Sequence, residues 1–212
     1  MKKRYFPLIP IGAALVFSIA VYSRLPEQVP VHWNWSGEPD RWASRVEGAF
    51  LMPAIMLVLW AALNWLPKID PRRANYALFR ETYDFVIAAV LTFMAVIHVL
   101  ALGASIGWPI AIDRVVPGLV GVLLVIVGNM LPRARSNWWF GIRTPWTLSS
   151  DRVWQKTHRV GGYLMMLAGL GMILHAMANE PWTMWLAAGL IVLCVAGTMV
   201  YSYLKWREER TV

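Results

Sequence analysis

The 212-residue chain is 58% hydrophobic and only 15% charged, with a formal net charge of +8. Soluble domains average about 25% charged residues, and apolar runs of membrane-spanning length recur here, so the composition excludes an ordinary soluble protein. The single cysteine, Cys194, excludes a disulfide within the chain. The sequence therefore predicts a polytopic membrane protein whose basic residues are divided unevenly between two faces.

Apolar segments long enough to cross about 30 Å of hydrocarbon occur six times in chain order. They lie at residues 6–23, 49–66, 84–106, 115–131, 160–178 and 183–204. Lys2-Lys3-Arg4 is typical of a signal peptide, but Ser18-Ile19-Ala20 is a poor cleavage site, so we expect an uncleaved first helix. We predict an all-α fold of six transmembrane helices in one integral membrane domain, 1–212, with an N-terminal half at 1–106 and a second half at 115–212.

The charges of the connecting segments predict the orientation. If the N-terminus lies in the cytoplasm, sixteen of the twenty Lys and Arg residues fall on the inner side. The exceptions are Arg24, Arg41, Arg45 and Arg114. Because an excess of basic residues on the cytoplasmic side is the general rule for membrane proteins, we predict that both termini are cytoplasmic.

The outer loop, residues 24–48, is rich in tryptophan and proline. We expect it to be extended over Val29–Trp35 and to turn at Ser36-Gly37 and Pro39-Asp40, because these residue types favour turn geometry. On the inner side, Asp70-Pro71 is a favourable helix start, since proline tolerates the first helical position. We therefore expect the third helix to begin near this pair and to lie along the membrane surface.

The inner loop, residues 132–159, places tryptophans among arginine, lysine and histidine. This composition can bind nucleic acid, but it is also that of a membrane-interface belt, and the inner location favours the belt. A belt alone does not require Gly141-Ile142-Arg143-Thr144-Pro145-Trp146-Thr147 in this order, since glycine and proline impose particular backbone geometry. We predict a folded hairpin with a contact between Arg143 and Trp146, no direct nucleic-acid binding, and a fifth helix capped by Ser149-Ser150-Asp151.

Three histidines are candidates for metal or proton chemistry. His98 and His175 lie at similar depths in the predicted third and fifth helices, and His32 lies on the outer loop. Without a ligand spacing such as HExxH, interhelical hydrogen bonds are favoured over zinc or a proton relay, and we expect no metal or other cofactor. Ser149-Ser150-Asp151 with His158 has the residue types of a hydrolase triad, but capping already accounts for them, so we do not predict an enzyme.

The two halves also share an arrangement used by transporters. Each consists of a helix, a long Trp-rich loop, a helix, a short connection and a helix, so the second half is inverted relative to the first. Asp40-Arg41-Trp42 in one loop corresponds to Asp151-Arg152-Val153-Trp154 in the other, although matches this short also arise by coincidence. A small secondary transporter or exporter built on a 3+3 inverted repeat is therefore the alternative function.

Residues 128–162, GNMLPRARSNWWFGIRTPWTLSSDRVWQKTHRVGG, closely resemble the signature of the SdpI-like bacterial immunity proteins. Residues 25–45, LPEQVPVHWNWSGEPDRWASR, resemble the small membrane domain of unknown function that precedes this signature in the same proteins. Together the two motifs reach from the first predicted helix to the fifth. The resemblance implies a multi-pass protein of the bacterial cytoplasmic (inner) membrane.

The matching positions define two candidate binding sites. On the inner loop they are Gly128, Asn129, Asn137, Gly141, Arg143, Thr144, Pro145, Trp146, Thr147, Trp154 and Arg159, and on the outer loop Pro30, His32, Trp33, Gly37 and Asp40. The resemblance implies protection against a secreted peptide toxin and, in the member for which the family is named, transfer of the toxin signal to a repressor held at the membrane. We therefore expect the outer loop to meet the toxin and the inner loop to meet a cytoplasmic repressor, while the helices contact the lipid bilayer.

Overall fold

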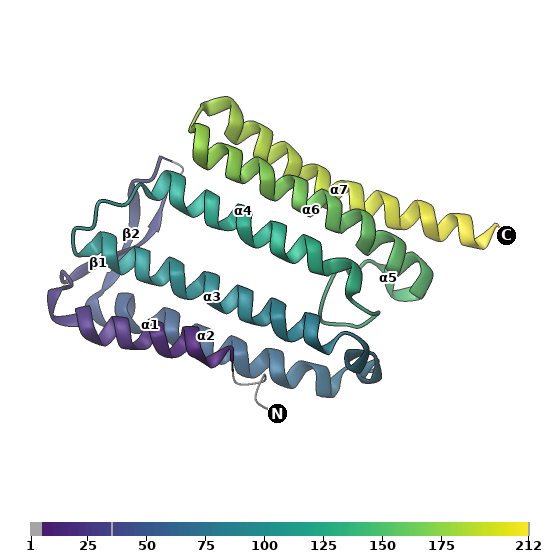
Figure 1. Ribbon diagram of the computed structural model, residues 1–212, viewed down its shortest axis with the longest axis horizontal. Helices are drawn as coiled ribbons and strands as arrows, with labels where there is room; N and C mark the ends of the chain where they lie inside the picture. Colours follow the sequence, from purple (N-terminus) through teal and green to yellow (C-terminus); the bar gives the residue numbers. More distant parts are fainter. Residues whose placement is uncertain (1–5, 35, 212) are drawn as a thin grey trace. The chain divides into compact units, whose positions relative to one another are not determined.

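A computed structural model describes residues 6–34 and 36–211. Lys2-Lys3-Arg4 and Trp35, which entered the predictions above, lie outside the described residues. The elements, with η for 3₁₀-helices, are α1 (Leu8–Val21), η2 (Tyr22–Arg24), β1 (Gln28–Trp33), β2 (Pro39–Ser44), α2 (Arg45–Ile69), η3 (Arg73–Leu78), α3 (Arg80–Ser105), α4 (Ile112–Met130), η4 (Leu131–Arg133), α5 (Pro145–Ser149), α6 (Asp151–Ala178) and α7 (Pro181–Arg210) (Figure 1).

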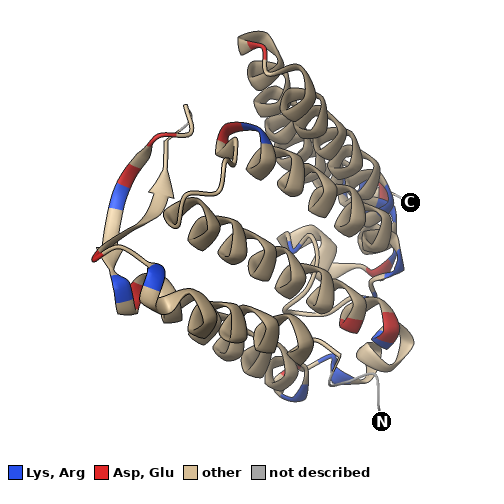
Figure 2. Ribbon diagram, turned by 60° about the vertical axis from the view of Figure 1, so that its left-hand side comes forward, with Lys and Arg blue, Asp and Glu red and all other residues tan. Residues whose placement is uncertain are grey.

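The fold is that of an all-α polytopic membrane protein, as predicted. Among the described residues, five helices are long and apolar enough to cross a membrane, and Leu8–Arg24 forms a shorter apolar helix. Figure 2 shows charged residues mainly near helix ends and in connections, with long uncharged stretches between them. Large apolar side chains such as Val192, Val195 and Val200 of α7 are exposed, which is unfavourable in water and fits contact with lipid.

The chain forms two compact units that cut across the two halves of the sequence. The first unit consists of Met1–Leu63 and Ile87–Val116, and the second unit of Asn64–Val86 and Pro117–Val212. The connection between the second and third predicted helices therefore packs with the second half of the chain. This assignment places the connection beside the inner loop.

In the first unit, the outer loop is a β-hairpin. β1 and β2 pair antiparallel, from Gln28 opposite Ser44 to Trp33 opposite Pro39, with irregular register around His32. The hairpin is anchored by Val29, which is 1% exposed and belongs to a core cluster with Val21, Leu25, Ala49 and Leu102. The predicted extended segment is thus confirmed over β1, and its pairing with a second strand is an addition to the prediction.

The turn of the hairpin is also held in place. The Asn34 side-chain oxygen accepts hydrogen bonds from the amides of Ser36 (2.9 Å) and Glu38 (3.0 Å). Gly37 has φ +75°, and a Cβ at this position would lie 3.0 Å from the Cβ of Asp113. Glycine is therefore required both by the backbone angle and by the close approach of Asp113, at the start of α4.

A buried hydrogen-bond network joins α1, α2 and α3 within the first unit. The Ser18 hydroxyl oxygen lies 2.6 Å from the Ala49 carbonyl oxygen and 2.7 Å from His98 Nε2. Because the hydroxyl has one proton, its donation to Ala49 requires that His98 Nε2 donates to Ser18. His98 is therefore explained by an interhelical hydrogen bond, the interpretation favoured from the sequence.

In the second unit, α4 and α6 pack backbone against backbone. A Cβ at Gly121 would lie 2.6 Å from the carbonyl oxygen of Gly169, and a Cβ at Gly128 would lie 2.7 Å from that of Gly162. Small residues allow such close approach between membrane helices, which gains dispersion contacts where lipid removes the hydrophobic driving force. Figure 1 shows α6 and α7 running side by side, connected by a turn at Asn179.

Candidate functional site

The inner loop of the second unit is folded around Asn137, whose side chain is fully buried. Its Oδ1 accepts hydrogen bonds from the amides of Trp139 (2.9 Å) and Phe140 (2.6 Å). Its Nδ2 donates to the carbonyls of Arg135 (2.8 Å) and Phe140 (3.0 Å). A carboxamide suits this position because it offers donors and an acceptor in one side chain. Asn137 therefore fixes the path of the loop.

Asp70, in the connection before α3, holds the same loop from outside. Its carboxylate, in a residue only 2% exposed, accepts hydrogen bonds from the amides of Trp138 (2.9 Å) and Arg72 (2.7 Å). The Tyr76 hydroxyl donates to it at 2.9 Å and lies 3.1 Å from Asn137 Oδ1. Asp70 and Asn137 are therefore joined through Tyr76 into one buried polar network.

Arg72 and Asn75 extend this contact. The guanidinium of Arg72 donates to the hydroxyl of Ser136 and to the carbonyl of Leu148, the latter at 2.5 Å. The Asn75 carboxamide donates to the carbonyl of Ser136 at 2.7 Å. The side chains of Arg72 and Asn75 thus donate to carbonyl groups that are not paired within the backbone of the inner loop itself.

The connection itself differs from the prediction of a helix beginning near Asp70-Pro71. Residues Arg73–Leu78 form the 3₁₀-helix η3, and α3 begins at Arg80. The physical reason is that Asp70 and Asn75 direct their hydrogen bonds to the inner loop, so the local helical preference gives way to tertiary contacts. Phe79 also packs on Phe140, with ring centroids 5.9 Å apart.

Gly141 and His158 form the second fixed point of the loop. Gly141 has φ +106°, and a Cβ there would lie 2.3 Å from His158 Nε2. The amide of Ile142 donates to the same nitrogen at 3.0 Å, and His158 Nδ1 lies 2.8 Å from the carbonyl oxygen of Trp154. Since Nε2 accepts, Nδ1 carries the proton and donates, and the ring is neutral. Gly141 is therefore required because the imidazole occupies the space of any side chain.

Trp154 supports this arrangement. Its ring is 0% exposed and stacks on His158 with centroids 4.0 Å apart. Its indole N–H donates to the carbonyl of Ala134 at 3.0 Å, so one face and the polar atom of the ring both have partners within the site. Trp154 is thus a structural member of the site.

The Thr144-Pro145-Trp146-Thr147 segment folds as the start of α5. Thr144 and Thr147 form a reciprocal capping box, and the Thr144 hydroxyl donates to that of Ser202 on α7 at 3.0 Å. Pro145 takes the first helical position, where no amide donor is needed. The Trp146 ring packs on Tyr203 of α7 at 5.2 Å. This segment therefore fastens the loop to the last helix.

Arg143 has a different partner from the predicted one. Its guanidinium donates to the carbonyl of Trp138 at 2.9 Å, whereas Trp146 packs on Tyr203, so the expected contact between Arg143 and Trp146 is wrong. The remaining inner-loop candidates, Asn129 and Arg159, have exposed side chains outside this network.

Ser150 confirms the predicted cap of the fifth helix. Its hydroxyl accepts from the amide of Val153 at 3.2 Å and donates to Glu209 at 2.7 Å. Ser149 donates to the carbonyl of Trp146. Both ring nitrogens of His158 are used elsewhere, so within the described part of the chain these residues do not form the hydrogen bonds of a catalytic triad.

The outer candidate site lies on the hairpin of the first unit. Asp40 Oδ1 is 2.5 Å from His32 Nδ1, and the two side chains are 43% and 66% exposed. Pro30 lies opposite Trp42 in the strand register. The geometry thus brings the exposed side chains of His32 and Asp40 together.

The structure also describes the partners of the histidines considered for metal binding. His32 contacts Asp40, His98 contacts Ser18, and His175 Nδ1 lies 3.0 Å from the hydroxyl of Thr183. Among residues 6–34 and 36–211, no group of three or more His, Cys, Asp or Glu side chains could hold a metal ion.

Tyr76 makes the inner network sensitive to alkaline pH. The pKa of Tyr76 is raised above its ordinary value. Burial is the largest cause, and the hydrogen bond to Asp70 is the next. Because the pKa is higher in the folded than in the unfolded chain, this stabilisation is complete below about pH 10 and is lost as the pH rises further. We expect Tyr76→Phe to lower the free energy of unfolding by about 1–2 kcal/mol at neutral pH. Above about pH 10, the free energy of unfolding is expected to fall less steeply in this variant than in the wild type. Unfolding curves of both proteins at about pH 8 and 11 check this, and equal declines would contradict it.

Comparisons with known proteins agree with the resemblance seen in the sequence. Residues 133–202 match the SdpI/YfhL protein family, and residues 9–57 match a Domain of unknown function (DUF1648). The chain is 25% identical over 208 residues to the Immunity protein SdpI of Bacillus subtilis, and the match covers 98% of each protein.

Two shorter similarities involve proteins of unassigned function. One is 37% identity over 62 residues to an uncharacterized protein of Archaeoglobus fulgidus, covering 29% of this chain and 33% of that protein. The other is 36% identity over 55 residues to the uncharacterized membrane protein YbgB of Bacillus subtilis, covering 25% and 60%. No solved structure matches the chain. The chain is thus a polytopic membrane protein whose residues 133–202 match the SdpI/YfhL family model, and the predicted resemblance to the SdpI-like immunity proteins is confirmed.

Proposed function

We propose that the protein is a non-enzymatic immunity protein of the bacterial inner membrane that protects its host against a secreted peptide toxin. The observation that carries this proposal is the similarity to the Immunity protein SdpI along 98% of the chain. The similarity includes the outer hairpin and the folded inner loop, so we assign a part in toxin protection to both regions.

The outer hairpin is the proposed toxin-binding surface. A peptide arriving from outside meets the exposed His32–Asp40 pair, which offers a hydrogen-bonding edge on a strand anchored at Val29. The turn at Gly37 is held as well, so the hairpin binds with little loss of conformational entropy.

The inner loop is the proposed surface for a cytoplasmic repressor. Asp70 and Asn137 fix its backbone, and this leaves Trp138 and Trp139 48% and 40% exposed on the predicted cytoplasmic side. Exposed tryptophans on a rigid support are favourable anchors for a protein partner. Arg143 orients the loop through the carbonyl of Trp138.

Protection assays test both assignments. The protein is expressed in a toxin-sensitive bacterium and challenged with secreted peptide toxins, beginning with those in Bacillus subtilis culture medium. We expect His32→Ala to reduce protection by about 10- to 100-fold, since a lost hydrogen bond to a charged group costs about 1.5–3 kcal/mol. Arg143→Ala is expected to keep protection and to lose recruitment of a repressor co-purified from the native host.

Arg207→Ala, at an exposed position on α7, is the control for both variants. All variants are compared at equal amounts of membrane-inserted protein. Absence of protection by the wild-type protein would refute the immunity role for the toxins tested. Full protection and full recruitment in Arg143→Ala would refute the role of the inner loop.

A further inference from the structure

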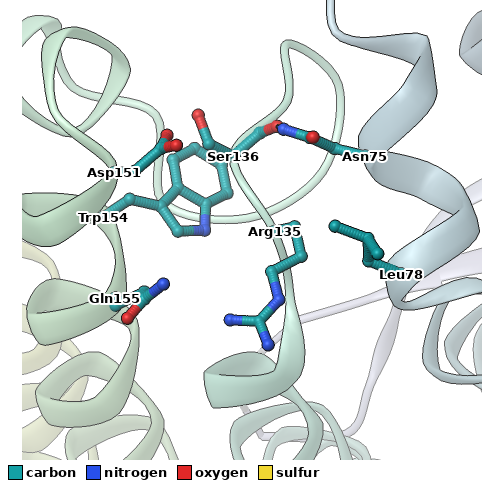
Figure 3. Close-up of a pocket in the computed structure, with 7 residues that line it drawn as sticks. All are labelled: Asn75, Leu78, Arg135, Ser136, Asp151, Trp154 and Gln155. Carbon is teal, nitrogen blue, oxygen red and sulfur yellow. The ribbon is translucent and has the colours of Figure 1, made fainter.

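A cavity of about 410 Å³ lies beside the folded inner loop, within the second unit. Figure 3 shows the lining residues, which are Asn75, Leu78, Arg135, Ser136, Asp151, Trp154 and Gln155. They come from the connection before α3, the loop after η4 and the first turns of α6. The hydrogen bonds of Asn75 to Ser136 and of Trp154 to Ala134 hold these three segments together.

The cavity lies at the depth of lipid headgroups. Leu78, Arg135 and Gln155 are four to six residues outside the ends of the predicted membrane segments. Of these, Gln155 lies on α6, which runs without a break into the predicted membrane segment, so its backbone is about 8 Å beyond the end of that segment. The headgroup layer adds about 5–8 Å on each side of the hydrocarbon, so we expect Gln155 and the residues that share its cavity to lie at the level of phospholipid phosphates.

Two polar groups in the cavity are free to bind a ligand. Within the described chain, the Arg135 guanidinium and the Gln155 carboxamide have no hydrogen-bond or ion-pair partner. In Figure 3 both lie on the same side of the Trp154 indole. A guanidinium binds phosphate oxygens through two parallel N–H bonds, and the carboxamide adds another donor. The pair therefore suits a phosphate diester.

Asp151 restricts the charge of that ligand. Its carboxylate lines the same cavity, is 75% exposed, and is paired only at 4.0 Å with Arg72. A bare anion is repelled by this carboxylate, whereas a headgroup with both a phosphate and an ammonium is attracted at both ends. Leu78, 69% exposed, offers an apolar contact for the glycerol and the first acyl carbons.

We propose that this cavity binds the headgroup of a zwitterionic phospholipid of the phosphoethanolamine type. Arg135 and Gln155 hold the phosphate diester, Asp151 receives the ammonium, and Leu78 contacts the apolar part. The lipid joins the connection before α3 to α6 and so stabilises the inner loop. This site is independent of toxin recognition by the outer hairpin.

Native mass spectrometry of the delipidated full-length protein in detergent tests the site. Phosphatidylethanolamine, phosphatidylglycerol and soluble phosphoethanolamine are titrated separately. We expect phosphatidylethanolamine to bind about tenfold more tightly than phosphatidylglycerol, and Arg135→Gln to weaken it by about tenfold. Asp151→Asn is expected to remove the preference while leaving phosphatidylglycerol bound.

Arg133→Gln is the matched control, because Arg133 is exposed two residues away and does not line the cavity. Equal losses in Arg133→Gln and Arg135→Gln would show a general basic belt and overturn the site. Soluble phosphoethanolamine that binds as tightly as the lipid would overturn the lipid assignment in favour of a free phosphate ester. An unchanged preference in Asp151→Asn would overturn the ammonium contact. Unfolding curves matching the wild type confirm that each variant is folded.

Discussion

Replacing Gly162 by alanine is expected to push α4 away from α6 and to lower the free energy of unfolding by about 2–3 kcal/mol. The added Cβ would lie 2.6 Å from the carbonyl oxygen of Gly128. This oxygen belongs to a helix backbone, so it cannot move aside as a flexible side chain can. The cost therefore falls in the upper part of the range for overpacked interiors.

Gly189→Ala is the matched control for this experiment. Gly189 lies in α7, and a Cβ there would have no atom within 4 Å. Since alanine has a higher helix propensity than glycine, this variant is expected to be unchanged or more stable by up to about 1 kcal/mol. Denaturant unfolding in detergent, followed by tryptophan fluorescence, measures both. Equal stability of the two variants would rule out the proposed backbone contact.

Asn137→Ala is expected to lower the free energy of unfolding by about 3–5 kcal/mol, the largest effect of a single change in the inner loop. The change removes hydrogen bonds to Trp139, Phe140 and Arg135 from a fully buried position. Each buried group left without a partner costs about 1–3 kcal/mol, and solvent reaches only some of them after the loop rearranges.

Asn34→Ala provides the comparison, because Asn34 also accepts two backbone hydrogen bonds but is exposed on the hairpin. Water replaces its contacts, so a loss of less than about 1 kcal/mol is expected. Limited trypsin digestion adds a local measurement: Asn137→Ala is expected to make the bonds after Arg135 and Arg143 more accessible. Equal stability losses at the two asparagines, with unchanged digestion, would contradict the central role of Asn137.

The membrane helices could be predicted because their signal is local. Uncharged apolar segments of about twenty residues have few alternatives to a spanning helix. Their ends were less predictable: α2 begins at Arg45, four residues before the apolar segment predicted at 49–66, whereas the start of α6 at Asp151 was predicted from its cap. Helical hydrogen bonds continue into the headgroup layer, where hydropathy no longer marks the helix. Only a cap such as Ser150 marks such an end.

The second hairpin strand could not be predicted from hydrophobic periodicity. Five of the six residues of Pro39–Ser44 are exposed, so the strand lacks the alternation by which a half-buried strand is identified. Its structure comes from pairing with β1, which is anchored by Val29 in the core. The turn at Gly37 could be predicted, since its residues have intrinsic turn preferences.

Some of the residues that hold the inner loop in place could be recognised in the sequence. The resemblance marked Asn137 and Gly141, and the structure gives a physical reason for each. It did not mark Asp70, Arg72 or Asn75, because their partners lie more than sixty residues away in the sequence. One signal was available: Asp70 is the only acidic residue between the second apolar segment and Arg80, among several basic ones. A carboxylate there is more useful as a buried acceptor than as a charge at the membrane surface.

The contact of Asp70 and Tyr76 with the inner loop limits which N-terminal halves can be combined with residues 115–212 in a recombinant protein. These two residues are encoded in the N-terminal half, yet their partners Trp138 and Asn137 are encoded in the C-terminal half. A recombinant that joins residues 115–212 to an unrelated N-terminal half loses the acceptor of the Trp138 amide. Transfer of residues 133–202 into another protein therefore keeps this contact only when an aspartate and a tyrosine with the spacing of Asp70 and Tyr76 are transferred as well.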